Sequence, residues 1–77
     1  SYVNHRLSRT NGMLLYGNLL AGALGEHKIA VEYFQRLLKV LPNDEVDLPK
    51  IYSELGRVYL LMGIYDKAKK YFRIGLH

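Results

Sequence analysis

An internal repeat constrains this chain more than any other feature of its sequence. A shift of 38 residues superimposes six residues of an earlier stretch on those of a later one: Gly25 on Gly63, His27 on Tyr65, Ala30 on Ala68, Tyr33 on Tyr71, Phe34 on Phe72 and Leu38 on Leu76. Six matches in one register are hard to attribute to chance, and periods of roughly 20–50 residues are typical of stacked repeat units. We therefore expect two similar units.

The later copy of the repeat predicts two short helices. One apolar stripe recurs at helical spacing, and a second stripe follows it. The stripes comprise Tyr52, Leu55, Tyr59 and Met62, and then Tyr65, Ala68, Tyr71, Phe72 and Gly75. Between them Gly63 can adopt the left-handed conformation that ends a helix, and Asp66 suits the first turn of the next helix. The expected structure is an antiparallel αα-hairpin.

Two small residues of this hairpin predict where its helices cross. Gly56 lies in a helix interior, where glycine costs about 1 kcal/mol relative to alanine, so its presence there indicates that two backbones approach closely. Ala68 is the matching small residue on the other helix. We therefore expect the hairpin to close at Gly56 and Ala68.

The earlier copy begins with an uncharged stretch. From Thr10 to Gly25 no residue is charged, and the apolar residues cover most of a helix circumference, as in a helix buried on several sides. A secretory signal peptide is the rival interpretation, because Arg6 and Arg9 precede the apolar run. We favour the helix, because the repeat continues through it into the next helix. A membrane span would need roughly 20 apolar residues, and this stretch is shorter and contains asparagine and glycine.

Turn signals divide the chain into an all-α arrangement of four helices. Pro42 stops a helix that begins at Glu26, and Pro49 suits the first position of the third helix. Residues 1–10 are a leader or the end of a preceding helix, and residues 11–42 form the first hairpin. Residues 43–48 form an acidic inserted loop, and residues 49–77 form the second hairpin.

The recurring residues of the second hairpin resemble the signature of the tetratricopeptide repeat. They are Leu55, Gly56, Tyr59, Gly63, Tyr65, Ala68, Phe72 and Gly75. The resemblance covers residues 11–77 and implies stacked αα-hairpins that serve as a protein-binding scaffold. The usual repeat has about 34 residues, so this copy carries an insertion between Pro42 and Pro49. The longer loop gives a faint similarity to the repeats of kinesin light chains.

Length and composition bound the remaining possibilities. The chain has 77 residues and no cysteine, so it is one small domain without a disulfide, and single cores of this size rarely contribute more than about 3–5 kcal/mol. Repeat arrays generally need about three units, and the chain stops at Gly75-Leu76-His77, within an apolar stripe, so we favour excision from a longer array. Composition leaves the compartment open, with the cytoplasm favoured.

The sequence contains no constellation that carries chemistry. His5, His27 and His77 lie on different elements, without a carboxylate or a cysteine at metal-ligand spacing. It has no catalytic triad, glycine-rich phosphate loop or pair of catalytic carboxylates. We therefore predict a protein that is not an enzyme and that needs no metal and no cofactor.

Four cations form a basic face on the last predicted helix. They are Lys67, Lys69, Lys70 and Arg73. Such a face could meet phosphate or an acidic partner, but more often it is simply solvated. The formal net charge of +4 is modest, so binding of nucleic acid through this helix is kept only as a third and less favoured alternative.

In the proteins that this chain resembles, the first helix of each hairpin lines a groove that receives peptide. Carried over by register, the groove residues are Leu15, Leu19, Gly22 and Ala23 from the first hairpin and Lys50, Ser53, Glu54, Arg57, Leu60 and Leu61 from the second. One wall is apolar and the other is charged. Asn18 enters the groove only if the register slips by one. Relatives that bind a chaperone's carboxylate tail have lysine and asparagine where this chain has Leu15 and Leu19, which argues against that role.

The resemblance therefore implies a protein-protein interaction module. It would bind a peptide or a helix chiefly by apolar contact, with charge selection by Lys50 and Arg57. The alternative is a structural segment that packs against flanking repeats or associates with itself. A competing interpretation of Arg57 is a solvated pair with Glu54 one turn away, which would contribute only about 0.2–0.5 kcal/mol.

Overall fold

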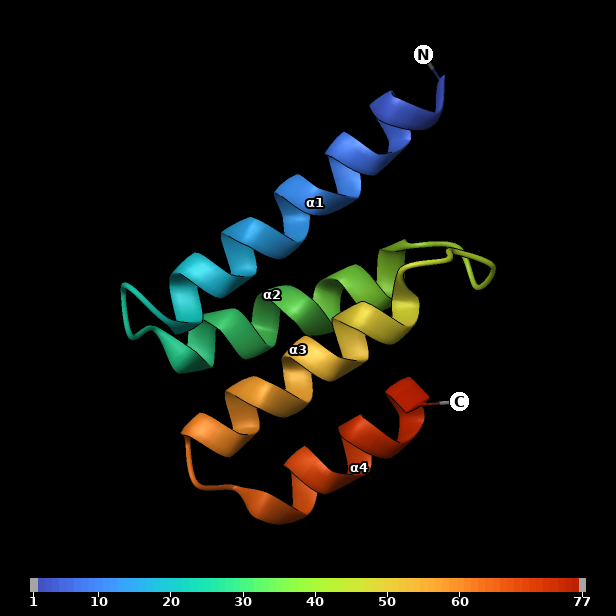
Figure 1. Cartoon of the computed structure of the whole chain (residues 1–77). Helices are drawn as coiled ribbons and strands as arrows, with labels where there is room; N and C mark the ends of the chain where they lie inside the picture. Colours follow the sequence, from blue (N-terminus) through green and yellow to red (C-terminus); the bar gives the residue numbers. More distant parts are fainter. Residues whose placement is uncertain (1, 77) are drawn as a thin grey trace.

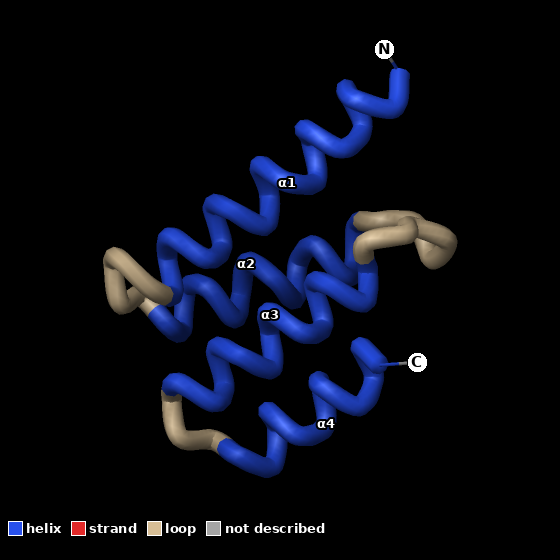
Figure 2. Tube along the Cα trace, in the orientation of Figure 1, coloured by secondary structure: helices blue, strands red, loops and turns tan. Residues whose placement is uncertain are grey.

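Four helices run back and forth in the computed structural model, which describes residues 2–76 (Figure 1). The helices are α1 (Tyr2–Ala21), α2 (His27–Val40), α3 (Leu48–Leu61) and α4 (Tyr65–Leu76). The described residues contain no strand, and only loops join the helices (Figure 2). The all-α fold of helical hairpins that the repeat predicts is confirmed.

α1 extends further towards the N-terminus than the sequence predicts. It begins at Tyr2 and runs without a break through residue 10, where we expected a boundary between a leader and the first hairpin. Neither glycine nor proline occurs between Tyr2 and Arg9, so nothing in the backbone chemistry interrupts the helix there. The leading segment is therefore continuous with the first helix. Ser1 and His77 lie outside the described residues.

A glycine in the left-handed conformation follows the first helix of each hairpin. The φ angle is 65° at Gly25 and 77° at Gly63, a region that costs other residues free energy. The second turn is tight, because the N–H of Ile64 donates to the carbonyl of Tyr59 at 2.9 Å directly after α3. The first turn is longer, since more residues separate the end of α1 from Gly25 than separate the end of α3 from Gly63.

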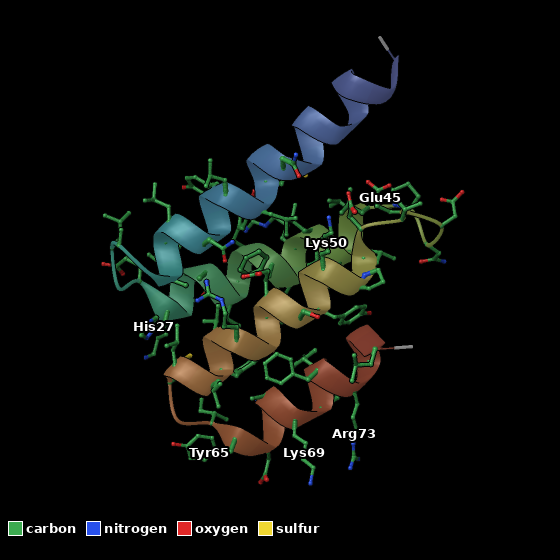
Figure 3. All side chains as sticks on the ribbon, viewed as in Figure 1. His27, Glu45, Lys50, Tyr65, Lys69 and Arg73 are labelled. Atoms are coloured by element: carbon green, nitrogen blue, oxygen red, sulfur yellow. The ribbon has the colours of Figure 1, made fainter. Side chains whose placement is uncertain are left out.

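The acidic loop between α2 and α3 is folded into turns. The N–H of Glu45 donates to the carbonyl of Pro42 at 3.1 Å, and the N–H of Leu48 donates to the carbonyl of Glu45 at 3.3 Å. Glu45 is buried at the base of this loop, although its neighbour Val46 is exposed (Figure 3). Pro49 lies in the first turn of α3, one position after the helix begins at Leu48, whereas we expected it at the first position. The loop is therefore compact and sets the point at which α3 begins.

The core is built around α3. This helix contacts all three others and contributes three fully buried side chains, Ile51, Leu55 and Val58. The other buried apolar residues are Leu20, Ala21, Ala30, Phe34, Leu37, Tyr59 and Ala68. α3 therefore has one side on α4 and another on α1 and α2.

Both hairpins close where a glycine of the first helix meets a phenylalanine of the second. A Cβ atom added to Gly56 would lie 3.0 Å from Cδ1 of Phe72 and 3.1 Å from the carbonyl oxygen of Ala68, which is itself buried. The crossing expected at Gly56 and Ala68 is confirmed. In the first hairpin the corresponding glycine is Gly17, where an added Cβ would lie 2.6 Å from Cε1 of Phe34.

The position of Gly17 sets the alignment of α1 with α3. Phe34 and Phe72 are 38 residues apart, but Gly17 and Gly56 are 39 residues apart. The additional residue lies in the longer turn that follows α1. α1 therefore aligns with α3 one residue away from the register that the repeat comparison gave, and this alignment pairs Asn18 with Arg57.

We expect Gly17→Ala to destabilise the chain by about 1–3 kcal/mol, because the added methyl overlaps the ring of Phe34, which is fully buried and would have to shift within the core. Gly12→Ala is the matched control on the same helix, since an added Cβ there meets nothing within 4 Å. Replacing that glycine should stabilise the chain by about 0.5–1 kcal/mol. Urea denaturation followed by circular dichroism measures both changes. Equal midpoints for the two variants would contradict the crossing at Gly17.

Candidate functional site

An exposed surface runs along α1 and α3. Each helix contributes one stripe of residues at helical spacing, and the alignment set by the two glycines places the stripes level with each other. The stripes are Asn11, Leu15, Asn18 and Gly22 on α1, and Lys50, Glu54, Arg57 and Leu61 on α3. Every one of these residues is exposed or half-buried. We call this set the α1–α3 surface.

Arg57 joins the two helices of this surface. Its Nη2 donates to Oδ1 of Asn18 at 2.8 Å, across to α1, and its Nε donates to Oε2 of Glu54 at 3.2 Å on α3. The side chains of Arg57 and Glu54 are 45% and 26% exposed, so solvent screening keeps the contribution of the ion pair below about 1 kcal/mol. A guanidinium has five N–H donors, so donors remain for a further acceptor. Both the predicted pair with Glu54 and a contact across the helices are therefore present.

Exposed leucines flank the Arg57 bridge. Leu15 lies one turn before Asn18 on α1 and is 71% exposed, and Leu61 lies one turn after Arg57 on α3 and is 51% exposed. A single exposed leucine is ordinary on a protein surface. Here two of them lie on the stripes that the Arg57 bridge connects, so the surface combines apolar side chains with a positioned polar group.

Lys50 lies at the start of the α3 stripe. Its Nζ is 3.8 Å from Oδ1 of Asp47, which is long for a salt bridge, and its side chain is 66% exposed (Figure 3). An exposed pair at that distance holds the lysine only weakly. The ammonium group is therefore accessible to a partner.

Six of the ten groove residues predicted from the sequence lie on the α1–α3 surface. The remaining four are Leu19, Ala23, Ser53 and Leu60. Ser53 lies at the crossing of α3 and α4, where its Oγ would be 2.9 Å from a Cβ on Gly75. Leu19 aligns with Val58, which is fully buried, yet Leu19 is 47% exposed. Ala23 lies in the turn after α1, and Leu60 is exposed beside the α3 stripe.

Asn18 is the one residue of the Arg57 bridge that the 38-residue shift placed outside the groove. The signal that finds it is a comparison of the helix-interior glycines, Gly17 and Gly56. The shift relied instead on Gly25 and Gly63, which follow turns of different length. Aligning the crossings, not the turns, places Asn18 level with Arg57.

Tyr59 connects α3 to both α2 and α4. Nε2 of Gln35 on α2 donates to its hydroxyl at 3.4 Å, and its ring stacks on Tyr71 of α4 with centroids 5.5 Å apart and an interplanar angle of 5°. Nζ of Lys67 lies 5.4 Å from the centre of the same ring. Burial raises the pKa of Tyr59, and the neighbouring Tyr71 adds to the increase. The hydroxyl and ring of Tyr59 therefore link α3 to α2 and α4.

A shallow depression lies between α1 and α2. It is lined by Tyr16, Leu20, Ile29, Glu32, Tyr33 and Arg36. Its volume is about 190 Å³, below the roughly 300–1,000 Å³ of ordinary ligand pockets. Tyr16 and Tyr33 meet edge to face with ring centres 5.0 Å apart, and burial, with a smaller effect of Tyr16, raises the pKa of Tyr33. The depression is too small and open to indicate a small-molecule site.

Neither a metal site nor a membrane span is found in residues 2–76. No group of three His, Cys, Asp or Glu side chains within this range could hold a metal ion. His27 is half-buried at the start of α2, away from the acidic loop (Figure 3). No helix of the described range is both long enough and apolar enough to cross a membrane.

Two sequence models of the tetratricopeptide repeat match the chain, one over residues 12–44 and the other over residues 49–73. Each matched range contains one of the glycine–phenylalanine crossings. The chain belongs to the tetratricopeptide repeat family. No curated protein and no solved structure matches it.

Tetratricopeptide repeats generally mediate protein–protein interaction and are usually not catalytic. The repeats of this chain therefore indicate a protein partner. The faint similarity to kinesin light chains stays a hypothesis, because both matching models describe the tetratricopeptide repeat in general.

We expect Asn18→Ala and Arg57→Ala to have coupled effects on stability, because the hydrogen bond between these side chains spans two helices. The coupling should be about 0.5–1 kcal/mol, since the bond is exposed. Asn18→Ala combined with Lys50→Ala is the control, because Lys50 lies two turns away from Arg57 along α3, and these effects should add. Chemical denaturation of the single and double variants measures both couplings. Additive effects of Asn18→Ala and Arg57→Ala would mean that the hydrogen bond does not stabilise the fold.

Proposed function

We propose that the chain is a non-enzymatic adaptor that binds a polypeptide segment on the α1–α3 surface. The observation that carries this proposal is the Arg57 bridge, an exposed guanidinium held between Asn18 of α1 and Glu54 of α3 with exposed leucines beside it. Interfaces between proteins combine apolar contacts with a few positioned polar groups, and arginine is enriched in them. The repeat family supports a protein as the partner.

Apolar contact supplies most of the affinity in this proposal. Fully burying a leucine side chain contributes about 1.5–3 kcal/mol, and Leu15, Leu60 and Leu61 are 71%, 46% and 51% exposed before a partner binds. Gly22 has no side chain, so a bound backbone can approach α1 there. A partner that places two apolar side chains across α1 and α3 fits this arrangement.

Charge adds a secondary selection. Glu54 already neutralises part of the charge of Arg57, so an incoming carboxylate shares the guanidinium with Glu54. Lys50 is held only by the long contact with Asp47 and is the more accessible cation. Acidic residues in the partner should therefore improve binding moderately, and they should do so most at low ionic strength.

A displayed random-peptide library selected on the purified chain supplies a ligand for the test, and fluorescence anisotropy at two salt concentrations measures its affinity. We expect Leu15→Ala to weaken binding about tenfold at both salt concentrations, because the lost contact is apolar. Arg57→Ala should weaken acidic peptides preferentially, and more at low salt.

Substitutions outside the surface serve as controls. Leu24→Ala removes a leucine that is 58% exposed in the turn after α1, and Arg36→Ala removes an exposed cation of α2, so both variants should bind normally. Leu19→Ala distinguishes the 38-residue shift from the alignment of Gly17 with Gly56. A loss of affinity equal to that of Leu15→Ala would favour the 38-residue shift, which places Leu19 in the groove. Full affinity in both Leu15→Ala and Arg57→Ala would contradict the proposal.

Self-association is the second candidate function, and one observation favours it. Tyr16 and Leu19 of α1 align with Leu55 and Val58 of α3. The two residues of α3 are fully buried, whereas Tyr16 and Leu19 are 52% and 47% exposed. Apolar side chains exposed at positions that the other hairpin buries suggest a surface that takes a partner.

We expect sedimentation equilibrium to show association that increases with concentration if this candidate holds. Leu19→Glu should prevent it, because the substitution places a charge within the apolar contact. Val40→Glu is the matched control, since Val40 is 67% exposed at the end of α2, away from the α1 stripe. A monomer at every concentration would exclude self-association and leave the adaptor proposal standing.

A further inference from the structure

The side of α4 that points away from α3 carries two cations. Lys69 and Arg73 are exposed, and both extend outward from α4 (Figure 3). They lie one turn apart, so their side chains are neighbours. Within the described residues neither has an ion pair, a hydrogen bond or a ring contact, whereas Lys67 and Lys70 lie over the rings of Tyr59 and Tyr71.

The internal repeat shows what this side of α4 corresponds to in the first hairpin. The 38-residue shift aligns Lys69, Arg73 and Leu76 with Val31, Gln35 and Leu38 of α2. That side of α2 packs on another helix, because Gln35 donates to Tyr59 of α3 and both Val31 and Leu38 pack against the core. On α4 the corresponding residues are exposed, and Leu76 is 85% exposed. This side of α4 therefore matches a helix-packing side that no described helix covers.

The charge on this side decides which kind of helix fits. A helix like α3 would cover Lys69 and Arg73 with apolar residues and remove both charges from water without a counter-charge, which is unfavourable. The acid of α4, Asp66, lies in the first turn and forms no ion pair with either cation in the described structure. Carboxylates on the incoming helix would supply the missing counter-charges.

We propose that this side of α4 binds an acidic amphipathic helix. Two carboxylates one turn apart face Lys69 and Arg73, and an apolar side chain covers Leu76. The guanidinium of Arg73 can donate two parallel hydrogen bonds to one carboxylate, which favours a carboxylate with a fixed position on a helix. Tyr65, one turn before Lys69 and 67% exposed, extends the same stripe (Figure 3). This surface is separate from the α1–α3 surface.

Nucleic acid fits these residues less well. Proteins that bind duplexes through phosphates typically make about 6–10 phosphate contacts, and two outward-pointing cations neutralise far fewer. The stripe also contains Tyr65 and Leu76, which offer apolar area to a helix. A protein helix is therefore the occupant that the charge and the repeat favour together.

Fluorescence anisotropy with two labelled, hydrocarbon-stapled helical peptides tests the proposal. The acidic probe carries two glutamates one turn apart and a leucine one turn further on, and the basic probe carries lysines in place of the glutamates. The chain should bind the acidic probe about tenfold more tightly at low salt, and the difference should shrink as salt is added. Lys69→Glu combined with Arg73→Glu should reverse the preference.

Lys28→Glu combined with Lys39→Glu is the matched control, because it makes the same change in net charge at exposed positions of α2. This control should keep the preference of the unmodified chain. Lys69→Gln combined with Arg73→Gln should remove the preference without reversing it, and circular dichroism checks that each variant is folded. Equal binding of the two probes to the unmodified chain, or loss of the preference in the control, would overturn the proposal. Tighter binding of duplex DNA than of the acidic probe at the same salt concentration would overturn it as well.

Discussion

The rest of the structure depends on the close contact of a glycine with a phenylalanine in each hairpin. The rings of Phe34 and Phe72 occupy the space that a side chain would fill at Gly17 and Gly56. Glycine is unfavourable in a helix interior, so the packing of the ring must offset that cost at each crossing. The contact sets how closely the helices of each hairpin approach. It thereby decides which sides of α3 remain for α1, α2 and the solvent.

The crossings leave α3 with three sides that have different roles. One side meets α4 through Gly56, and another, which includes Val58, is buried under the first hairpin. The third includes Lys50 and Arg57 and stays in contact with solvent. Shortening a side chain on the buried sides would leave a cavity and reduce stability, so those sides are constrained by packing. Selectivity for a partner can therefore reside on the third side without loss of the fold.

The sequence predicts the helices of the second hairpin well because apolar residues recur along them at helical spacing. Gly56 and Ala68 identified the second crossing, and Gly63 identified the turn before α4. All three lie in the hairpin whose turn is short. The continuation of α1 through residue 10 was not predictable, because polar residues without glycine or proline can end a helix or continue it.

The candidate site was harder to predict than the fold. The alignment of α1 with α3 depends on the extra residue in the turn after α1. A repeat comparison that superimposes Gly25 on Gly63 starts after this residue and therefore misaligns α1 by one position. With Asn18 level with Arg57, the two helices are joined by a polar bridge. With Leu19 in that place, the contact would be apolar. Ser53 shows a second limit, since its position against α4 follows from the crossing of two helices and not from spacing along one. A one-dimensional pattern gives the side of a helix but not the neighbour that covers it.

The two hairpins share the glycine and the phenylalanine that build the crossings. They differ on another side of the second helix, which packs on α3 in the first hairpin and is exposed in the second. Phe34 and Phe72 are equivalent and identical, whereas Gln35 of α2 corresponds to Arg73 of α4. The outward side of α4 is therefore cationic, while residues 10–21 of α1 carry no charge. Stacking α4 of one copy on the uncharged part of α1 of the next copy would bury Lys69 and Arg73 without a counter-charge and is unfavourable. Any self-association through Leu19 should instead pair α1 with α1 about a two-fold axis, which leaves the cationic side of α4 available to an acidic partner.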